Sequence, residues 1–425
     1  MNEKEIKKQA NLKLYPIYKM LSWDLLCFYS ISFIFLTQFK GIDAYLVVLL
    51  DAFYTVFKII FQIPCTTLLE KVGAKTSIIV ANVAIALYLI ILIFSHNFID
   101  LIIANIFCSF GYVIKNIGET GLLYDSLNPT PERGHIFADI EGTGTAYYYF
   151  FDAITSSLTG FLYVIHPYLP MILSLLFTLS SIFILSKMHN VSKISGLSHS
   201  SLETSHLKDL KTSFKFIFKS GRLKGLLMFY SIFSGFISLM SNYRRSLLQD
   251  ININVEYFGL IFAVLGIISA ISSKHQHWFH NKLRNHTLGF LGITYCLSCI
   301  FAGLAVIISF SSSISIILIL LMYAIQHIIK GPFYTLSKRY LSNFTNESLR
   351  NKIYAATDLV ESISKTILTV IASILLEITP TAYAMVILSC VIVLVLLRVL
   401  NYMKTRLGLK PEQYSKKETA YSEVQ

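Results

Sequence analysis

Ionisable side chains lie inside apolar stretches in the first half of the sequence. Asp24, Lys115, Glu119 and Asp152 each sit among residues that are otherwise lipid-soluble. A charge at the centre of a bilayer costs about 2.5–3.5 kcal/mol even on lenient scales, so such residues face a bundle interior or a water-filled cavity. We expect these four residues to bind a substrate or to carry protons.

Lys115 and Glu119 are spaced i,i+4, which places them on one face of a helix and lets them pair. A carboxylate beside a lysine can exchange its proton for the charge of a substrate, which is the chemistry that ion coupling needs. A purely structural ion pair is the alternative interpretation.

Asp24 and Asp152 have aromatic neighbours. Asp152 follows Tyr148 by one helical turn, and Asp24 follows Trp23 directly. On a continuous helix, Asp24 would share one stripe with Phe28, Ile31, Phe35 and Gln38. With Glu119, these two aspartates are the candidate proton-carrying groups. Asp24 also lies near the inner end of its segment, so a role at a cytoplasmic gate stays open, as does a structural role for Asp152.

The second half of the sequence offers two further candidates. Lys330 precedes the Gly331–Pro332 step, which predicts an interrupted, kinked helix of the kind found at membrane binding sites. Packing alone is the alternative there. Asp358, Glu361 and Lys365, also candidates for binding a substrate or protons, follow at i, i+3 and i+7, with Glu361 oriented to pair with Lys365. Because this set begins near the cytoplasmic end of its segment, a place for part of it in a cytoplasmic gate is the alternative.

The composition indicates which elements position these residues. Only 14% of the 425 residues are charged, 54% are hydrophobic, and the mean hydropathy is +0.61; soluble domains carry about 25% charged residues. The apolar stretches are too long for barrel strands and match the length that crosses a bilayer. We predict an all-α membrane protein of twelve transmembrane helices in two six-helix halves, at residues 17–38, 44–69, 76–96, 99–125, 138–164, 168–187, 223–242, 255–273, 287–309, 313–335, 353–377 and 382–403.

The distribution of Lys and Arg predicts the orientation. These residues gather in alternate loops, so the positive-inside rule places both termini in the cytoplasm and accounts for the net charge of +12. The first segment is expected to be retained rather than cleaved as a signal peptide. We expect an N-terminal bundle (1–187), a basic amphipathic cytoplasmic linker (188–222), a C-terminal bundle (223–404) and a cytoplasmic tail (405–425), all in the cell membrane.

No catalytic or cofactor motif accompanies these segments. His275, His277, His280 and His286 cluster without a cysteine or carboxylate, so a pH-sensitive surface or plain interfacial residues are favoured over a metal site. The Cys296–Cys299 pair lies within an apolar run and is interpreted as packing. We therefore expect no enzyme, cofactor, metal or nucleic-acid partner; a membrane enzyme or receptor is the remaining alternative.

Every third predicted segment lacks interior charges, which fits two halves built from 3+3 repeats whose chargeless helices face lipid. The loop "TTLLEKVGAKTS" then places Glu70, Lys71, Gly73 and Lys75 at the acid, base, glycine and final base of a known motif. With this loop, the chain resembles bacterial members of the major facilitator superfamily of transporters. Thr66 and Ala74 depart from the pattern.

The resemblance implies a cytoplasmic gate and a monomeric protein. Glu70 would face the start of the eleventh span, and Lys71 or Lys75 would reach Asp125 at the inner end of the fourth. A solvated loop is the alternative. Breaking such a gate would shift the balance of inward and outward states rather than abolish binding.

The resulting functional hypothesis is a secondary transporter that moves a small molecule, exporting partly hydrophobic compounds in exchange for protons. The wealth of Tyr and Phe favours it, whereas the fifth span lacks the Gly-Pro motif of drug antiporters. The alternative is an importer or facilitator of a small charged solute, which Lys115, Lys330, Arg244 and Arg245 favour.

Overall fold

A computed structural model describes residues 3–128, 133–189, 221–308, 312–343 and 347–407, and within these ranges it contains helices and no strand. The helices form two compact units. Unit 1 comprises Met1–Asp43, Phe53–Glu203 and Asn254–Ala263; unit 2 comprises Ala44–Ala52, Thr204–Ile253 and Val264–Gln425. The predicted linker at 188–222 and tail at 405–425 lie mostly outside the described residues, so these boundaries stay predictions.

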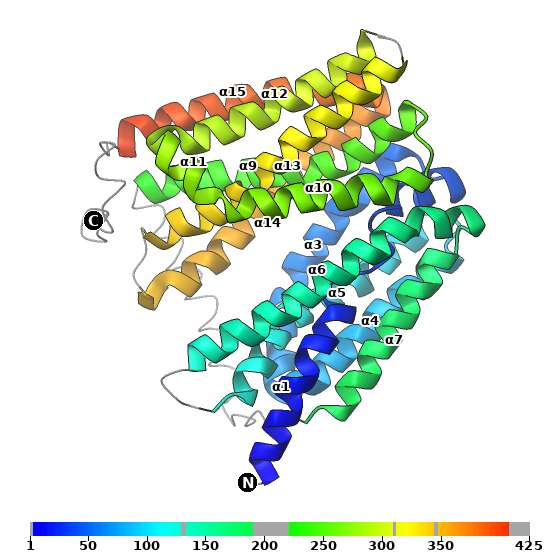
Figure 1. The fold of residues 1–425 in the computed structure, drawn as a ribbon, viewed down its shortest axis with the longest axis vertical. Helices are drawn as coiled ribbons and strands as arrows, with labels where there is room; N and C mark the ends of the chain where they lie inside the picture. Colours follow the sequence, from blue (N-terminus) through cyan, green and yellow to red (C-terminus); the bar gives the residue numbers. More distant parts are fainter. Residues whose placement is uncertain (1–2, 129–132, 190–220, 309–311, 344–346, 408–425) are drawn as a thin grey trace. The chain divides into compact units, whose positions relative to one another are not determined.

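The helices of unit 1 are α1, the short α2, a π-helical turn, most of α3, and α4 to α7 (Figure 1). Their bounds are α1 Glu3–Ser22, α2 Ser32–Ile34, η1 Phe35–Phe39, α3 Ala44–Val72, α4 Ala74–Phe94, α5 Phe98–Ser126, α6 Arg133–Ile165 and α7 Leu169–Lys187.

Unit 2 contains α9, most of α10, and α11 to α15, with a short 3-10 turn after α11. The bounds are α9 Gly221–Asp250, α10 Glu256–Lys274, α11 Gln276–Leu283, η2 Arg284–His286, α12 Thr287–Ile307, α13 Ser312–Asn343, α14 Glu347–Ile378 and α15 Thr381–Leu407. The short helix α11 lies where the sequence suggested only a loop.

Ten helices of the described chain are long and apolar enough to cross a membrane, so the all-α membrane class is confirmed. The predicted spans 17–38 and 138–164 are not among them. Residues 138–164 do lie in one helix, α6, but its Tyr, Thr, Ser and Gly content lowers its hydropathy. The count of twelve stays a prediction.

The expectation of one continuous helix over residues 17–38 is wrong. Helix α1 ends at Ser22, and turns occupy the chain until α2 begins at Ser32. Within these turns Cys27 has φ of 65°, a left-handed conformation that costs a non-glycine residue about 1–2 kcal/mol. The helical stripe proposed for Asp24 therefore does not exist, because residues 23–31 do not follow a helical period.

The interruption expected at Gly331–Pro332 is also absent, since α13 runs unbroken from Ser312 to Asn343 with Pro332 inside it. Gly331 has another role there. A Cβ atom added to it would lie 2.3 Å from the carbonyl oxygen of Ser269 in α10. The glycine thus permits a close approach of two helices in unit 2.

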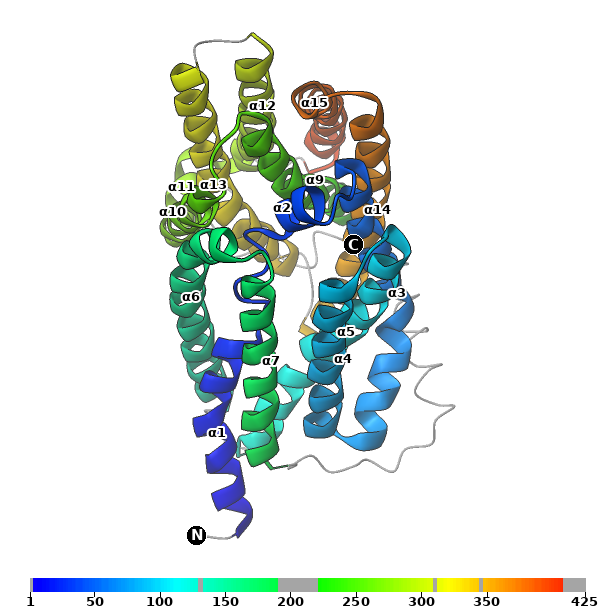
Figure 2. The ribbon, with the colours of Figure 1, turned by 90° about the vertical axis from the view of Figure 1, so that its right-hand side faces the viewer.

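Packing within unit 1 brings α1 against α6 and α7, and α4 against α5 and α7 (Figure 2). Tyr15 and Tyr18 of α1 join Ile78 and Leu122 in one buried apolar cluster. A Cβ atom on Gly111 would lie 2.8 Å from the carbonyl oxygen of Ala81, so this glycine lets α5 approach α4 closely. These contacts fix the faces of α1 and α5 that carry the polar residues described below.

In unit 2, α12 packs against α13 and α15, and α9 against α14 and α15. The chargeless helices were expected to be the most exposed, but 56% of the α4 window and 50% of the α12 window are buried in protein, against 28% for α3 and 17% for α14, which carry interior charges. Absence of charge therefore does not mark the outermost helices, because apolar helices also serve as packing partners inside each unit.

Candidate functional site

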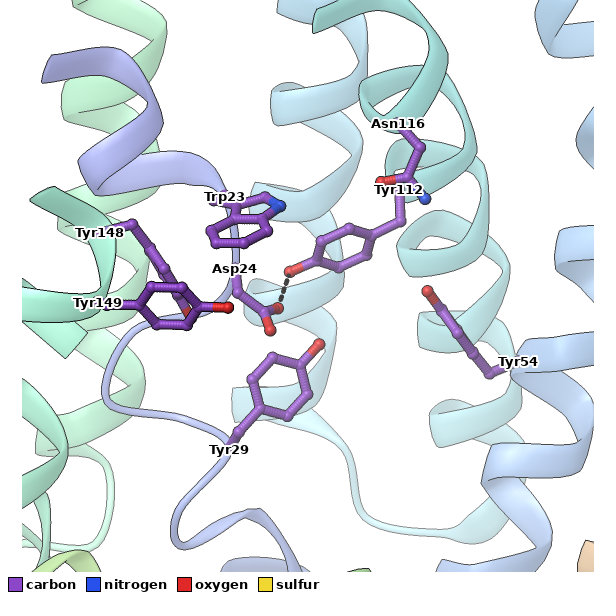
Figure 3. Close-up of a pocket in the computed structure, with 8 residues that line it drawn as sticks. All are labelled: Trp23, Asp24, Tyr29, Tyr54, Tyr112, Asn116, Tyr148 and Tyr149. Carbon is purple, nitrogen blue, oxygen red and sulfur yellow. Dashed lines mark hydrogen bonds between the residues drawn. The ribbon is translucent and has the colours of Figure 1, made fainter. Parts of the chain in front are cut away.

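A pocket of about 380 Å³ lies within unit 1. Six of its eight lining residues are aromatic, and Asp24 is the one that carries a formal charge (Figure 3). The Asp24 carboxylate accepts hydrogen bonds from the Tyr112 hydroxyl at 2.8 Å and from the backbone N–H of Leu25 at 3.0 Å. The lining residues are Trp23, Asp24, Tyr29, Tyr54, Tyr112, Asn116, Tyr148 and Tyr149.

The break after α1 is the element that builds the pocket. Non-helical backbone at membrane depth is tolerated where protein buries it or where it lines a cavity, and residues 23–31 supply Trp23, Asp24 and Tyr29. Helix α5 adds Tyr112 and Asn116, which are spaced i,i+4 on one face. Tyr54 comes from α3, and Tyr148 and Tyr149 come from α6.

Aromatic rings pack edge to face on one side of Asp24. The ring centroid of Trp23 lies 4.8 Å from that of Tyr148 and 5.4 Å from that of Tyr149. Both distances fall within the range of favourable aromatic pairs, which contribute about 0.5–1.5 kcal/mol beyond area burial. Figure 3 shows these three rings around the carboxylate. The three rings thus restrict one another's positions through these contacts.

The predicted Lys115–Glu119 pair is present beside the pocket. The Lys115 Nζ lies 3.9 Å from Glu119, and both residues are less than 10% exposed. Glu119 also accepts a hydrogen bond of 2.6 Å from the Tyr18 hydroxyl. Lys115 interacts electrostatically with Glu119 and with Asp24, so it connects the pair to the pocket.

A second pair, which the sequence analysis missed, joins α1 to α6. Lys19 forms an ion pair with Glu141, and the Tyr15 hydroxyl donates to the same carboxylate at 2.7 Å. Asp152, by contrast, accepts a hydrogen bond of 3.2 Å from Ser156 and has no ion-pair partner in the described part of the chain. It interacts electrostatically with Asp24. Two of the predicted carboxylates, Asp24 and Asp152, therefore form no ion pair among the described contacts.

Four residues of the predicted gate lie at the junction of α3 and α4 in unit 1. Gly73 joins α3 to α4 with φ of 83°, a conformation that favours glycine. Lys71 is exposed, and Lys75 donates to the carbonyl oxygen of Ser186 at the end of α7, at 3.2 Å. The side chain of Glu70 lies outside the described structure. A gate that includes Asp125 stays a prediction.

In unit 2, the most buried charge of the described residues is Arg244 of α9, which is 2% exposed. Its guanidinium donates to the Tyr295 hydroxyl and to the Gln326 side-chain oxygen, both at 3.0 Å, and to Ser241. Its Nε has no hydrogen-bond acceptor, and no carboxylate pairs with it among the residues described. Lys330 of α13 lies close enough to interact with Arg244 electrostatically.

The predicted set on α14 is arranged differently from the expectation. Glu361 accepts a hydrogen bond from Ser234 of α9, and the described contacts include no ion pair between Glu361 and Lys365. The backbone of Lys365 lies where Gly235 lets α9 approach α14. Asp358 is exposed. The expected Glu361–Lys365 pair is therefore absent from the described contacts, and the part of the three residues in binding stays a prediction.

Four residues of the pocket lining were not singled out from the sequence: Tyr29, Tyr54, Tyr112 and Asn116. Tyr112 and Asn116 had a signal, because each lies within one turn of Lys115 on α5. No such signal pointed to Tyr29, since its position depends on the helix break after Ser22. In the histidine cluster, the Nδ1 atom of His280 forms a hydrogen bond of 2.8 Å with the Tyr340 hydroxyl.

Long apolar helices around a pocket within one bundle are typical of a multi-pass membrane protein with an internal cavity. A family model described as "Major Facilitator Superfamily" matches residues 20–322, more than half of the chain. The protein belongs to this superfamily, which confirms the resemblance seen in the sequence. No curated protein sequence matches the chain significantly.

Solved structures of transporters share the fold. A point mutant of the nucleoside transporter NupG aligns with a TM-score of 0.72 and 12% identity, covering 95% of this chain and 100% of that one. A D-xylose-proton symporter aligns at 0.65 and 11%, covering 96% and 98%. A bacterial homologue of the human lysosomal transporter Spinster aligns at 0.66 and 11%, covering 96% and 97%. At these identities the likeness concerns the fold alone.

Proposed function

We propose that the protein is a secondary active transporter that exports a small, partly hydrophobic molecule in exchange for protons. The observation that carries this proposal is the aromatic pocket around Asp24, next to the buried Lys115–Glu119 pair. Concave sites lined by aromatic side chains, with polar groups that fix the orientation of the ligand, are the usual form of small-molecule sites. The transporter fold of the superfamily is consistent with this role and not with an enzyme.

Lys115 supplies the coupling between substrate and proton. With Glu119 ionised, the lysine charge is neutralised locally and Asp24 is left to hold the substrate. When Glu119 takes up a proton, the lysine charge is released and acts on Asp24 instead, which weakens the hold on the substrate. Substrate and proton then compete, which is the condition for exchange.

The remaining expectations form part of the same proposal. Alternating access would expose the pocket to each side of the plasma membrane in turn, with Glu70, Lys71, Gly73, Lys75 and Asp125 forming the cytoplasmic gate. We infer a monomer with both termini in the cytoplasm. Asp24 is assigned to the pocket rather than to the gate, because its carboxylate lines the cavity.

Proteoliposomes with an imposed pH gradient test the proposal. We would measure uptake of three probes of different charge, ethidium, chloramphenicol and benzoate, with protein-free vesicles as the control. Exchange with protons predicts accumulation of at least one probe in vesicles with an acidic lumen. Glu119→Gln should abolish this gradient-driven uptake, whereas substrate exchange without a gradient should persist at higher substrate concentration, because glutamine mimics the protonated state that holds the substrate weakly. Lack of coupling for all three probes would contradict the proposal.

The alternative function is an importer or facilitator of a small charged solute. The observation that favours it is Arg244, a buried cation without a described carboxylate partner, with Lys330 nearby. An isolated buried charge is costly, and an anionic solute would compensate it. This alternative predicts that benzoate accumulates in vesicles with an alkaline lumen, or equilibrates without a gradient.

A further inference from the structure

We propose that the pocket of unit 1 selects organic cations, namely quaternary or protonated amines that carry an apolar or aromatic body. This inference rests on the proposed function, because it takes the pocket as the substrate site. It adds the charge and shape of the substrate, which neither the fold nor the family decides.

The first step is a count of charges around the pocket. The nearby lysines are already engaged, since Lys115 pairs with Glu119 and Lys19 pairs with Glu141. Asp24 and Asp152 receive hydrogen bonds only from hydroxyl groups and a backbone N–H. Among the described contacts neither aspartate forms an ion pair, and Asp24 shares the charge of Lys115 with Glu119. A cationic ligand would supply the missing counter-charge.

The second step concerns the aromatic rings. Their faces attract cations, and the attraction is stronger where the site is shielded from water. Two rings of the pocket already hold an ammonium group of the protein itself: Lys19 Nζ lies 4.8 Å from the Trp23 ring, and Lys115 Nζ lies 5.3 Å from the Tyr112 ring. The rings of Tyr148, Tyr149 and Tyr29 surround Asp24 in Figure 3 and have no such occupant among the described contacts.

The third step concerns size and polarity. A volume of about 380 Å³ lies at the lower end of the range for small-molecule sites. Apart from Asp24, the wall offers only hydroxyl groups, one amide and ring faces. An organic cation with one or two rings fits these limits, whereas an anion would meet Asp24 and find no unpaired lysine in the lining.

The chain offers a direct reporter of binding. It contains two tryptophans, Trp23 in the pocket and Trp278 on α11, where the side chain is 56% exposed. Trp278→Phe leaves Trp23 as the single tryptophan. We would titrate this purified variant in detergent, without any gradient, and follow its fluorescence with benzyltrimethylammonium, its uncharged carbon isostere neopentylbenzene, and benzoate.

We expect benzyltrimethylammonium to bind at least about tenfold more tightly than neopentylbenzene, because only the cation gains from the carboxylate and the ring faces. Asp24→Asn should remove this preference. Asp100→Asn is the matched control, since it makes the same change in the first turn of α5, away from the residues that line the pocket, and should leave both affinities unchanged. Equal affinities, tighter binding of benzoate, no binding of the cation at millimolar concentration, or an unaffected Asp24→Asn variant would overturn the inference.

A second variant guards against misfolding of Asp24→Asn. Tyr149 is 60% exposed, so Tyr149→Leu keeps apolar bulk while removing one ring face. Affinity for the cation should fall about threefold and that for neopentylbenzene should not change; equal changes would count against a cation cage. Selective binding without proton coupling would refute the proposed function alone, whereas coupled transport of benzoate would refute the cation inference alone.

Discussion

Each of the two units buries charge in an apolar helix bundle, but the units do so with opposite signs. Among the described residues of unit 1, the carboxylate Asp24 forms no ion pair and faces an open pocket of aromatic rings. Among those of unit 2, the most buried charge without an ion pair is the guanidinium of Arg244, which neutral acceptors on α9, α12 and α13 surround. The first arrangement leaves room for a ligand, whereas the second satisfies most of the charge from within.

The difference follows from backbone structure. Unit 1 breaks a helix at Ser22 and opens space at the break, whereas in unit 2 the residues around Arg244 lie on unbroken helices. A discontinuous helix frees polar backbone groups and side-chain directions that a regular helix does not offer. Unit 1 is therefore where we place recognition of the substrate.

Removing one charge of the buried Lys115–Glu119 pair in unit 1 should have the largest effect on stability. Glu119→Gln leaves Lys115 buried without a counter-charge, so we expect a loss of about 3–5 kcal/mol in the free energy of unfolding, measured by titration with SDS. The double variant Glu119→Gln with Lys115→Met should regain most of this loss. If the single variant were as stable as the unchanged protein, the two residues would not be an energetic pair.

Removing the buried charge of Arg244 in unit 2 should destabilise the protein less. Arg244→Met removes a donor from Tyr295 and Gln326 but leaves no uncompensated carboxylate, so we expect a loss of about 1–3 kcal/mol in the same assay. A loss as large as that of Glu119→Gln would mean that Arg244 has an anionic partner, and the contrast between the units would not hold.

Replacing a closely packed glycine by alanine should lower the free energy of unfolding by a similar amount in both units. A Cβ atom would lie 2.6 Å from Ile85 at Gly111, and 2.6 Å from Val386 at Gly303. Crowding costs about 1–3 kcal/mol, and the better helix propensity of alanine offsets about 1 kcal/mol. We therefore expect Gly111→Ala and Gly303→Ala to lose about 0–2 kcal/mol each, with Gly121→Ala, where no atom is near, as the control. A loss confined to one unit would show that the helix contacts differ.

The smallest effect is expected for the hydrogen bond to Asp24. Tyr112→Phe removes a donor at the wall of a pocket that water can enter, so stability should fall by about 0.5–1 kcal/mol. Tyr295→Phe removes the corresponding partner of Arg244 at a site that is fully buried, and its loss should be larger. Equal losses would mean that the pocket excludes water as thoroughly as the interior of unit 2.

Much of the fold could be predicted from the sequence, because long apolar segments have few ways to satisfy their backbone in lipid. The charge pair at Lys115 and Glu119 was equally predictable, since i,i+4 spacing brings side chains together wherever a helix forms. The loop that contains Gly73 carried the family resemblance, and its glycine adopts the positive φ that makes the residue necessary.

The pocket itself could not be predicted in full. Residues 23–31 contain neither glycine nor proline, so no local signal of a helix break was present, and the break depends on tertiary contacts such as the hydrogen bond from Ser174 to the Leu26 carbonyl. Gly331–Pro332 carried the usual signal and yet lies within an unbroken helix. Long-range pairs such as Lys19 with Glu141 also have no spacing rule to reveal them.

The turns between Ser22 and Ser32 have a consequence for deuterium labelling. The amide hydrogens of Leu26, Phe28 and Ile31 donate within short turns to Asp24, Leu25 and Phe28 rather than within a helix. They should exchange with solvent deuterium sooner than the amides of α4 or α5. A molecule seated on Asp24 would slow that exchange, so mass spectrometry of this one peptide could sort a mixture of unlabelled compounds by their occupancy of the pocket.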